Sequence, residues 1–472
     1  MKKTKIVATM GPASTDSKEV LKEMILQGTN VCRLNFSHGK HEVHLKIINM
    51  VREINAELGV DVALLADLQG PKIRIGEVEN NGIELVDGST LIITTNECIG
   101  TSERVYLTYK EFPKDVNIGD RVLMDDGKLQ LEVTATNGID EVTTNVLNGG
   151  ILSSKKGVNL PNTKISLPCL TVKDLRDLDF ALEHNVDWIG LSFVRSGKDI
   201  DDLRKLITKK NKHTKIIAKI EKPEAILDID AIIKSADAIM VARGDLGVEV
   251  PFETVPNIQK MLVRKSRSLG KPSIVATQMM ESMITNFSPT RAEVNDVANA
   301  VLDGADAVML SGETSVGKHP VEVIKAMSKI VREIEMNEEI YHKESMPEKN
   351  DQRFISDSIC FNATRLSQRV EAKAIITMTF SGYTAYKMSS QRPKSDIYVF
   401  TENRQILTQL NLVWGVKGFY YDKLVSTDQT INDSIKILEE KGLLKKGDYV
   451  INVASVPIDE KGKSNMVKLS EV

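Results

Sequence analysis

The stretches KIIAKIE, residues 215–221, and AIMVARGD, residues 238–245, show the pattern that decides the fold. Each is a short apolar run that ends in a carboxylate, Glu221 in the first and Asp245 in the second. The same pattern predicts six further strands, which are Ile6–Met10, Val31–Leu34, Val62–Ala66, Trp188–Phe193, Pro272–Ala276 and Ala307–Leu310. Most of these strands precede a stretch with helical periodicity. The sequence therefore predicts a (β/α)8 TIM barrel of the α/β class, with its chemistry at the carboxyl ends of the strands.

One gap in the strand spacing predicts an inserted domain. About 120 residues separate Asp67 from Trp188, far more than one helical return needs. This gap contains short β segments and turn signals such as Asp125-Asp126-Gly127. We predict a small all-β lid domain at residues 70–168, between barrel parts 1–69 and 169–345. A polar stretch and then new apolar strands predict a C-terminal α/β domain at residues 346–472.

The composition of the chain argues against nucleic-acid-binding, membrane-spanning and secreted proteins. A net charge of −3 and a pI near 6.3 argue against nucleic-acid binding. No apolar run is long enough to span a membrane, and the basic residues Met1–Lys5 precede a strand rather than the apolar core of a signal peptide. The 4 cysteines are scattered and form no C-x-x-C pair, which favours a reducing compartment. We therefore expect a cytoplasmic protein with no nucleic-acid or membrane partner.

Alternating residues at the end of one predicted strand suggest a metal site. Lys219 and Glu221 share one face because strand side chains alternate, and Asp245 ends the neighbouring strand. Two carboxylates from adjacent strands suit Mg²⁺ when substrate phosphate and water complete its coordination. Lys219 could then stabilise a phosphoryl group in transfer. The alternative is an ordinary Lys–Glu pair at a barrel rim.

Other strand ends add polar groups to the same face. In Arg33-Leu34-Asn35-Phe36-Ser37 the three polar residues point one way, which suits an anion and a cation held side by side, although a solvated strand end is equally consistent. Thr277 and the segment Ser311-Gly312-Glu313 would complete a polar ring. The segment 312–319 nearly matches a P-loop, but His319 replaces the hydroxyl that binds Mg²⁺, so we expect no P-loop.

In the C-terminal region, the segment Thr379–Thr384 lies between a predicted strand and a predicted helix. Its hydroxyls and free backbone N–H groups could bind an anion at the helix N-terminus. Simple capping of that helix is the alternative reading.

Seven long motifs together resemble the pyruvate kinase family over essentially the whole chain. They are Ala8–Ser14 (ATMGPAS), Arg33–His38 (RLNFSH), Lys219–Glu224 (KIEKPE), Met240–Gly247 (MVARGDLG), Ala276–Met283 (ATQMMESM), Pro289–Asp296 (PTRAEVND) and Met309–Thr314 (MLSGET). The resemblance implies the reaction of phosphoenolpyruvate with ADP to give pyruvate and ATP, the last step of glycolysis. It also implies a homotetramer with a C-terminal regulatory domain.

The resemblance further implies roles for individual residues. Glu221 and Asp245 would bind Mg²⁺ or Mn²⁺, Lys219 would bridge the phosphoryl group in transfer, and Arg33 would contact the phosphate of phosphoenolpyruvate. The groups that would hold the substrate carboxylate are the backbone at Gly244-Asp245 and the hydroxyl of Thr277.

For the nucleotide and the proton, four more positions match the family pattern. Arg74 and, on the lid, Lys156 match positions that contact the nucleotide. Ser311 and Glu313 match residues near the route by which the enolate carbon is protonated, and the donor itself stays open.

The family's monovalent-cation site shows a departure. Many members hold K⁺ with the side chains that match Asn35, Ser37 and Asp67 and with the carbonyl that matches Leu68. Those members typically carry a glutamate where this chain has Lys72. An ammonium group can replace a monovalent cation at an anionic site. We therefore expect Lys72 to substitute for K⁺, which makes K⁺ a possible but dispensable cofactor.

The anion-binding segment matches the family's effector-phosphate loop, through Thr379, Ser381, Gly382 and Thr384. The loop 454–465 lacks the tryptophan and arginine that fructose-1,6-bisphosphate-responsive members place there. A sugar monophosphate or AMP is therefore as plausible a phosphorylated effector. Two other functions remain open at this point: a metal-dependent aldolase or lyase acting on phosphoenolpyruvate or pyruvate, and a non-catalytic metabolite sensor.

Overall fold

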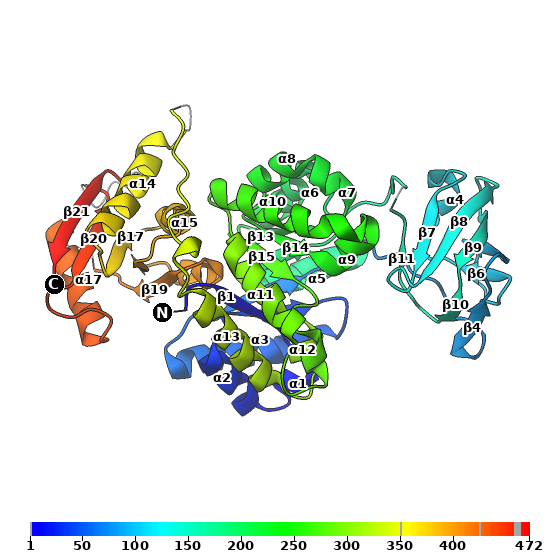
Figure 1. Ribbon diagram of the computed structural model, residues 1–472, viewed down its shortest axis with the longest axis horizontal. Helices are drawn as coiled ribbons and strands as arrows, with labels where there is room; N and C mark the ends of the chain where they lie inside the picture. The colour runs from blue at the N-terminus through cyan, green and yellow to red at the C-terminus, as the bar shows by residue number, and fades with distance from the viewer. Residues whose placement is uncertain (1, 162, 350–351, 424–425, 457–463) are drawn as a thin grey trace.

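The computed structural model describes every residue except 1, 162, 350–351, 424–425 and 457–463. Within the described residues, eight parallel strands close into a barrel in the order β1-β16-β15-β14-β13-β12-β3-β2 (Figure 1). Their bounds are β1 (Lys5–Thr9), β2 (Val31–Asn35), β3 (Ala63–Asp67), β12 (Trp188–Leu191), β13 (Lys215–Ile220), β14 (Ala238–Ala242), β15 (Ser273–Ala276) and β16 (Ala307–Leu310). The predicted (β/α)8 barrel is confirmed.

Helices surround the barrel strands. Their bounds are α1 (Pro12–Thr15), α2 (Lys18–Gln27), α3 (His41–Leu58), α5 (Val172–Glu183), α6 (Gly197–Lys209), α7 (Pro223–Leu227), α8 (Ile229–Ser235), α9 (Arg243–Glu249), α10 (Val255–Ser268), α11 (Arg291–Asp303), α12 (Gly312–Ser315) and α13 (Pro320–Ile334). The strands are apolar on both faces because one face packs against these helices and the other fills the barrel interior. Local signals set the helix ends: Thr290 caps the start of α11, and Gly304, at φ 96°, ends it.

Most barrel strands begin or end within one residue of the prediction, and one strand end differs by two residues. The strand predicted to reach Phe193 ends at Leu191, because Ser192 and Phe193 form a turn in which Phe193 has a φ of +54°. The turn aims the Phe193 N–H at Glu221, whose Oε2 accepts its hydrogen bond at 2.7 Å. The residues lost from the strand are therefore used to position a carboxylate.

The insertion between β3 and β12 is built of short strands and forms its own apolar core, to the right of the barrel in Figure 1. Its elements are β4 (Gly82–Leu85), β5 (Thr90–Thr94), β6 (Arg104–Tyr106), α4 (Phe112–Asp115), β7 (Arg121–Met124), β8 (Leu129–Thr136), β9 (Glu141–Asn148), β10 (Gly150–Ser153) and β11 (Val158–Asn159). The two connections to the barrel pair with each other, since Arg74 and Gly157 form an antiparallel bridge. The insertion therefore begins and ends at one place.

The C-terminal region forms a sheet in the order β19-β18-β17-β20-β21, to the left of the barrel in Figure 1. Its elements are α14 (Phe354–Arg369), β17 (Ala374–Met378), α15 (Tyr383–Ser390), β18 (Asp396–Thr401), α16 (Arg404–Gln409), β19 (Val416–Tyr420), α17 (Thr427–Glu440), β20 (Tyr449–Ala454) and β21 (Met466–Glu471). The predicted α/β class of this region is confirmed. Strand β21 was not predicted, and it pairs antiparallel with β20.

The amino-terminal end of the barrel is closed by the C-terminal region. Leu412, just after α16, is fully buried and joins the cluster of side chains inside the barrel, which includes Trp188 and Met240. Arg392 is also buried, and its Nη2 lies 2.9 Å from Asp306 Oδ2. Among the described residues, no helix is long and apolar enough to cross a membrane.

Candidate active site

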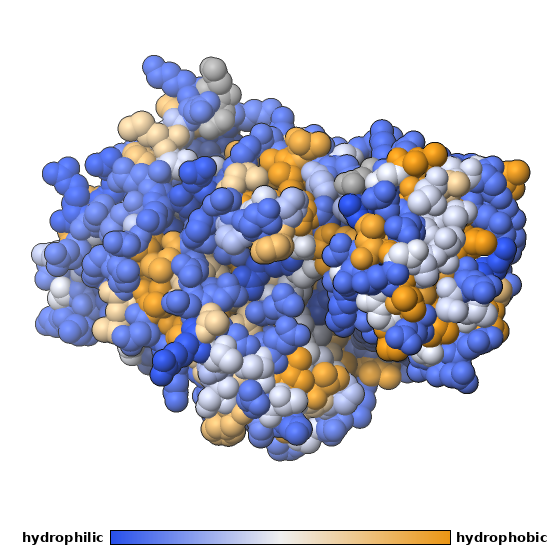
Figure 2. Space-filling model, turned by 45° about the vertical axis from the view of Figure 1, so that its right-hand side comes forward, coloured by the Kyte–Doolittle hydropathy of each residue, from blue (hydrophilic) through white to orange (hydrophobic). Residues whose placement is uncertain are grey.

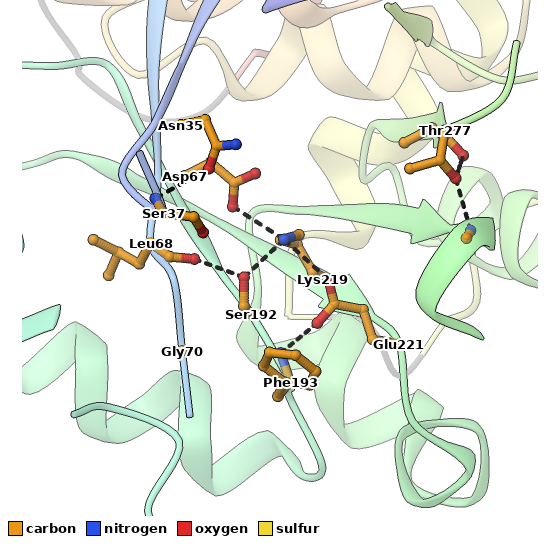
Figure 3. A network of polar contacts seen from close by, with 12 residues as sticks. Asn35, Ser37, Asp67, Leu68, Gly70, Ser192, Phe193, Lys219, Glu221 and Thr277 are labelled. Atoms are coloured by element: carbon orange, nitrogen blue, oxygen red, sulfur yellow. Dashed lines mark hydrogen bonds and ion pairs between the residues drawn. The ribbon is translucent and has the colours of Figure 1, made fainter. Parts of the chain in front are cut away.

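The Lys219 ammonium lies at the centre of a buried polar network at the carboxyl end of the barrel (Figure 3). Its Nζ lies 2.9 Å from Glu221 Oε1 and 3.2 Å from Asp67 Oδ1, and it donates a hydrogen bond to Ser192 Oγ at 2.7 Å. Alternation in β13 places Lys219 and Glu221 on one face, as the sequence predicts. The four groups come from three neighbouring strands, β3, β12 and β13, and the turns that follow them.

Arg33 enters the same network from β2. Its Nε donates to Asp67 Oδ2 at 2.6 Å, and its Nη1 donates to Thr9 Oγ1 at 2.8 Å. Asp67 thus lies between two cations, Arg33 and Lys219. Burial opposes ionisation of Asp67, but Lys219 and then Arg33 outweigh it, so the pKa of this carboxyl lies below its usual range.

The network leaves two carboxylate oxygens available. Within the described residues, Glu221 Oε1 and Asp67 Oδ1 are buried and accept no well-aligned hydrogen bond, although both contact the Lys219 ammonium. Burial raises the pKa of Glu221 to about 7, and the nearby charge of Asp245 adds to this, while Lys219 opposes it. Burial disfavours the Lys219 cation, yet Asp67 and Glu221 outweigh burial and raise its pKa. At Glu221 and Asp245, two carboxylates thus act on one ammonium, so this part of the site is short of positive charge.

Asp245 is the second predicted metal ligand, and it lies in the first turn of α9. Its charge acts on the pKa of both Lys219 and Glu221, so it belongs to the same site. No group of three or more His, Cys, Asp or Glu residues that could hold a metal occurs among the described residues. Two carboxylates fit Mg²⁺, which keeps several waters and takes further ligands from a substrate.

Thr277 and Gly244 meet beside this pair of carboxylates. The Gly244 N–H donates to Thr277 Oγ1 at 2.7 Å. Thr277 has a φ of +70° and the next residue, Gln278, a φ of +54°, a conformation that costs free energy in non-glycine residues. The turn after β15 is thus held in a strained shape that presents the Thr277 hydroxyl to the start of α9.

Ser311 and Glu313 form a separate part of the rim. The buried carboxylate of Glu313 accepts hydrogen bonds from the N–H of Ser311 at 2.6 Å and of Met280 at 3.1 Å. Burial raises the pKa of this carboxyl. Glu313 therefore ties the turn after β16 to the turn after β15.

The predicted monovalent-cation set lies at the ends of β2 and β3. Asn35 Oδ1 accepts from the Ser37 N–H at 3.1 Å, and the Leu68 carbonyl accepts from Ser192 Oγ at 2.7 Å (Figure 3). Because Ser192 also accepts from Lys219, this hydroxyl joins the Leu68 carbonyl to the lysine. Lys72 lines the nearby cleft, and its ammonium has no ion pair in the part of the chain that the structure describes.

A cleft runs between the barrel and the insertion, and Figure 2 shows a hollow between the right-hand lobe and the rest. Its walls include Lys72, Asp245 and residues of the insertion. Burial lowers the pKa of His38, and the charges of Arg74, Lys72 and Arg33 lower it further. These three cations therefore lie within electrostatic range of His38, and a concentration of positive charge favours an anionic ligand.

The two predicted nucleotide contacts lie where the insertion meets its connections. Arg74 Nη1 donates to the Lys155 carbonyl at 2.9 Å, and Lys156 Nζ lies 2.7 Å from Asp125 Oδ1. Both side chains are partly exposed.

The predicted effector residues lie far from this site along the fold, in the C-terminal region. Thr379 Oγ1 accepts from the Gly382 N–H at 3.0 Å, and Ser381 Oγ from the Tyr383 N–H at 3.5 Å. Gly382, at φ 80°, begins α15, and Thr384 Oγ1 lies 3.1 Å from Ser464 Oγ. Both capping and anion binding remain compatible with this geometry. Most of the loop 454–465 lies outside the described residues.

Sequence reasoning missed two residues that organise the site. Ser192 was counted as strand, although its hydroxyl bridges Leu68 and Lys219. Arg195 donates to the carbonyls of Ile165 and Leu167, which lie on the return connection from the insertion. The signal that could have identified Ser192 and Arg195 is that both are polar residues just after the apolar strand β12.

Comparison with known proteins agrees with this geometry. The family model described as "Pyruvate kinase, barrel domain" matches residues 1–324, and "Pyruvate kinase, alpha/beta domain" matches residues 357–470. The chain is 44% identical over 470 residues to a pyruvate kinase of Geobacillus stearothermophilus, with 99% of this chain and 80% of the relative covered. It is 44% identical over 466 residues to that of Corynebacterium glutamicum, at 99% and 97% coverage.

A solved structure gives the same result. The crystal structure of a pyruvate kinase from Cryptosporidium parvum superposes with a TM-score of 0.93 at 38% identity, covering 100% of this chain and 96% of that one. Sequence and structure agree over the barrel and the C-terminal region alike. The chain therefore belongs to the pyruvate kinase family of phosphotransferase enzymes.

Proposed function

We propose that this chain transfers the phosphoryl group of phosphoenolpyruvate to ADP, giving pyruvate and ATP in the last step of glycolysis. The observation that carries this proposal is the buried Lys219 ammonium between Asp67 and Glu221, beside a cleft whose walls include the cations Lys72, Arg195 and Lys222. Two anionic substrates repel each other, so a site that joins them needs this concentration of positive charge.

We assign Glu221 and Asp245 as the ligands of Mg²⁺ or Mn²⁺. The carboxylate oxygen of Glu221 that has no aligned hydrogen bond supports this assignment, as does the shared charge field of the two residues. When bound, the divalent ion neutralises charge on the phosphoryl oxygens and orients them.

The chain's own residues supply binding and orientation. Arg33 binds the phosphate of phosphoenolpyruvate, held in place by Asp67 and Thr9. Lys219 contacts the phosphoryl group in transfer. The Gly244-Asp245 backbone and the Thr277 hydroxyl hold the substrate carboxylate at the strained turn.

After transfer, the enolate must gain a proton at carbon. Ser311 and Glu313 lie on the rim where this proton arrives, and their hydrogen bonds fix that part of the rim. We assign them a role in the proton route rather than in phosphate binding.

Arg74 and Lys156 contact the nucleotide, one from a connection and one from the insertion. We assign residues 70–168 as a lid domain between barrel parts 1–69 and 169–345, followed by a regulatory domain at 346–472. Lid closure over the cleft would exclude water from the transfer and limit hydrolysis.

The decisive experiment is a coupled assay with purified protein, phosphoenolpyruvate, ADP and Mg²⁺. Pyruvate must form only when ADP is present, with one ATP for each pyruvate. ADP-independent pyruvate formation would indicate a lyase, and no turnover with phosphoenolpyruvate binding intact would indicate a sensor.

We further propose that Lys72 supplies the charge that K⁺ supplies at Asn35, Ser37, Asp67 and Leu68 in other members. Its position on the cleft wall and its lack of an ion pair among the described residues support this. Activity in Na⁺ or tetramethylammonium buffer should therefore equal activity with K⁺. Strong activation by K⁺ contradicts the proposal.

For regulation, we propose that Thr379, Ser381, Gly382 and Thr384 bind the phosphate of an effector, such as a sugar monophosphate or AMP. The three hydroxyls that gather beside the left-handed Gly382, at the N-terminus of α15, support it. Phosphoenolpyruvate saturation curves with each candidate test it, and unchanged curves throughout overturn it. We also propose a cytoplasmic homotetramer, which sedimentation can test.

A further inference from the structure

A second buried ion pair lies in the cleft wall that also includes Asp245. Lys222 Nζ lies 2.7 Å from Glu249 Oε1, and the two side chains are only 8% and 1% exposed. Lys222 follows Glu221 in the chain. Glu249 lies one helical turn after Asp245 in α9. The ion pair therefore links the two segments that carry the proposed metal ligands.

We propose that the Lys222–Glu249 ion pair is a brace that sets the separation of the proposed ligands Glu221 and Asp245. Lys222 and Glu249 are then positioning residues for the divalent cation. This inference rests on the proposed function, since it takes those two carboxylates as the metal ligands. Neither Lys222 nor Glu249 is assigned contact with substrate or metal.

The local backbone shows why such a brace is needed. Glu221 is the first residue beyond β13, and Asp245 lies in a seven-residue helix, so neither ligand is held by a long regular element. Glu221 has one carboxylate oxygen fixed by the Phe193 N–H. Among the described residues no hydrogen bond or ion pair joins Asp245 directly to Glu221, and the Lys222–Glu249 pair provides the link between their segments.

The energetics favour a positional role over a stabilising one. Desolvating two charges roughly cancels the attraction between them, so a buried ion pair contributes little net stability. Groups that orient metal ligands, in contrast, typically change metal affinity by about 10–100-fold when they are removed. A pair buried this deeply next to two carboxylates is better explained by ligand geometry.

The same carboxylate also holds the insertion. Asn159, in β11, donates from Nδ2 to Glu249 Oε1 at 2.8 Å, and both residues line the cleft. Strand β11 pairs with β7 of the insertion. The brace thus connects the position of the lid to the segment that carries Asp245.

The test measures Mn²⁺ binding to the full-length protein without substrates, by the loss of the free-ion electron paramagnetic resonance signal. The variants are Lys222→Met, Glu249→Gln and the double variant. A simple charge effect predicts that Lys222→Met tightens Mn²⁺ binding and Glu249→Gln weakens it. The brace predicts that both single variants weaken binding, by about tenfold.

The double variant is the sharpest case, because it keeps the net charge and leaves no unpaired buried charge to disturb folding. The brace predicts that the double variant binds Mn²⁺ about tenfold more weakly than the unmodified protein. Its affinity for Mn²⁺ should be no lower than that of the weaker-binding single variant, because the same interaction is lost in all three variants. Unchanged affinity in the double variant overturns the proposal.

Controls separate this inference from the proposed function. Lys265→Met breaks an exposed ion pair with Asp230 and should leave Mn²⁺ binding unchanged. Glu221→Gln and Asp245→Asn should abolish binding; if they do not, the metal assignment fails and the brace fails with it. If they abolish binding while the double variant binds normally, only the brace is wrong.

The lid connection has its own readout. Asn159→Ala removes the hydrogen bond to Glu249 but leaves the contact between Lys222 and Glu249. The affinity for Mn²⁺ without substrates should therefore stay within about twofold of that of the unmodified protein. The KM for ADP should rise by about fivefold or more. An unchanged KM for ADP removes Asn159 from the proposal.

Discussion

The two ends of the barrel both bury charged groups, but they satisfy them differently. At the amino-terminal end, Arg392 donates to two backbone carbonyls and to Asp306, and Asp306 also accepts from the Ser273 and Trp414 N–H groups. At the carboxyl end, Asp67 and Glu221 each keep a buried oxygen with no aligned hydrogen bond within the described residues, facing the Lys219 ammonium.

The difference shows what each end does. At the amino-terminal end, backbone carbonyls and Asp306 bind both Nη atoms of Arg392, although its Nε has no hydrogen-bond partner among the described residues, and Leu412 closes the barrel. The carboxyl end opens into the cleft, and its buried oxygens Asp67 Oδ1 and Glu221 Oε1 face the Lys219 side chain rather than a backbone N–H. Charged groups that the fold itself pairs have a structural role, while carboxylate oxygens without an aligned hydrogen bond are available to a ligand.

Lys219→Met tests the carboxyl end of the barrel and should have the largest effect of the variants described here, a loss of turnover. The variant loses the group that contacts the transferred phosphoryl, so kcat should fall about a thousandfold while phosphoenolpyruvate still binds. A coupled assay and a binding titration measure both. The control is Lys215→Met on the same strand, which contacts Asp237 at the other end and should keep kcat within about twofold. Near-normal turnover of Lys219→Met would refute the role.

Arg392→Met tests the amino-terminal end, with the opposite outcome. It leaves Asp306 buried without its cation, which should cost about 3 kcal/mol or more of unfolding free energy. Denaturant unfolding gives this value, and kcat at 25 °C should stay within about twofold of the unmodified protein. A stable variant with greatly reduced kcat contradicts the division between the two ends.

Leu412→Ala tests the amino-terminal end without changing any charged group. Removing this side chain from the barrel interior leaves a cavity and should cost about 3 kcal/mol of unfolding free energy. The matched control is Leu227→Ala, whose side chain is 88% exposed and should change stability by less than about 0.5 kcal/mol. Equal effects in the two variants would show that Leu412 does not close the barrel.

The smallest effect concerns Asp187, which accepts hydrogen bonds from Leu64 and Thr408 at the amino-terminal end. Burial raises its pKa to about 6, and these hydrogen bonds oppose the shift. The folded state therefore holds the proton more tightly than the unfolded state, and stability falls as pH rises through about 4 to 6.

The side chain in Asp187→Asn cannot ionise. The unfolding free energy of this variant, relative to that of the unmodified protein, should therefore rise by about 1 kcal/mol between pH 5 and pH 7. Thermal unfolding of both proteins at each pH measures the change, and any constant offset from the altered hydrogen bonds cancels. A difference that does not vary with pH shows that Asp187 is ionised throughout.

Much of the fold follows from local sequence. The barrel strands are short apolar runs with turn signals, and the alternation in Lys219-Ile220-Glu221 correctly predicted that the two charged groups lie together. Strand β21 could not be predicted, because none of its residues is buried and their exposure does not alternate at this sheet edge, and because its pairing with β20 is a tertiary contact.

The parts of the site that were missed depend on contacts between distant segments. Ser192 acts through Leu68 and Lys219, which lie on other strands, and Glu249 acts through Lys222 and Asn159. A sequence pattern shows which side chains share a strand face, but it does not show which turn faces which across the barrel. Those partners needed the fold.

The pairing of the two connections at Arg74 and Gly157 has a consequence for how the chain folds. Strands β3 and β12 are neighbours in the barrel although about 120 residues separate them, and closing so long a loop costs conformational entropy. The Ile75 N–H bonds to the Lys156 carbonyl at 3.0 Å, and the Val158 N–H to the Ile73 carbonyl at 3.0 Å. Once the insertion has folded around its own core, β3 and β12 are joined by a much shorter effective loop, so their pairing then costs less conformational entropy.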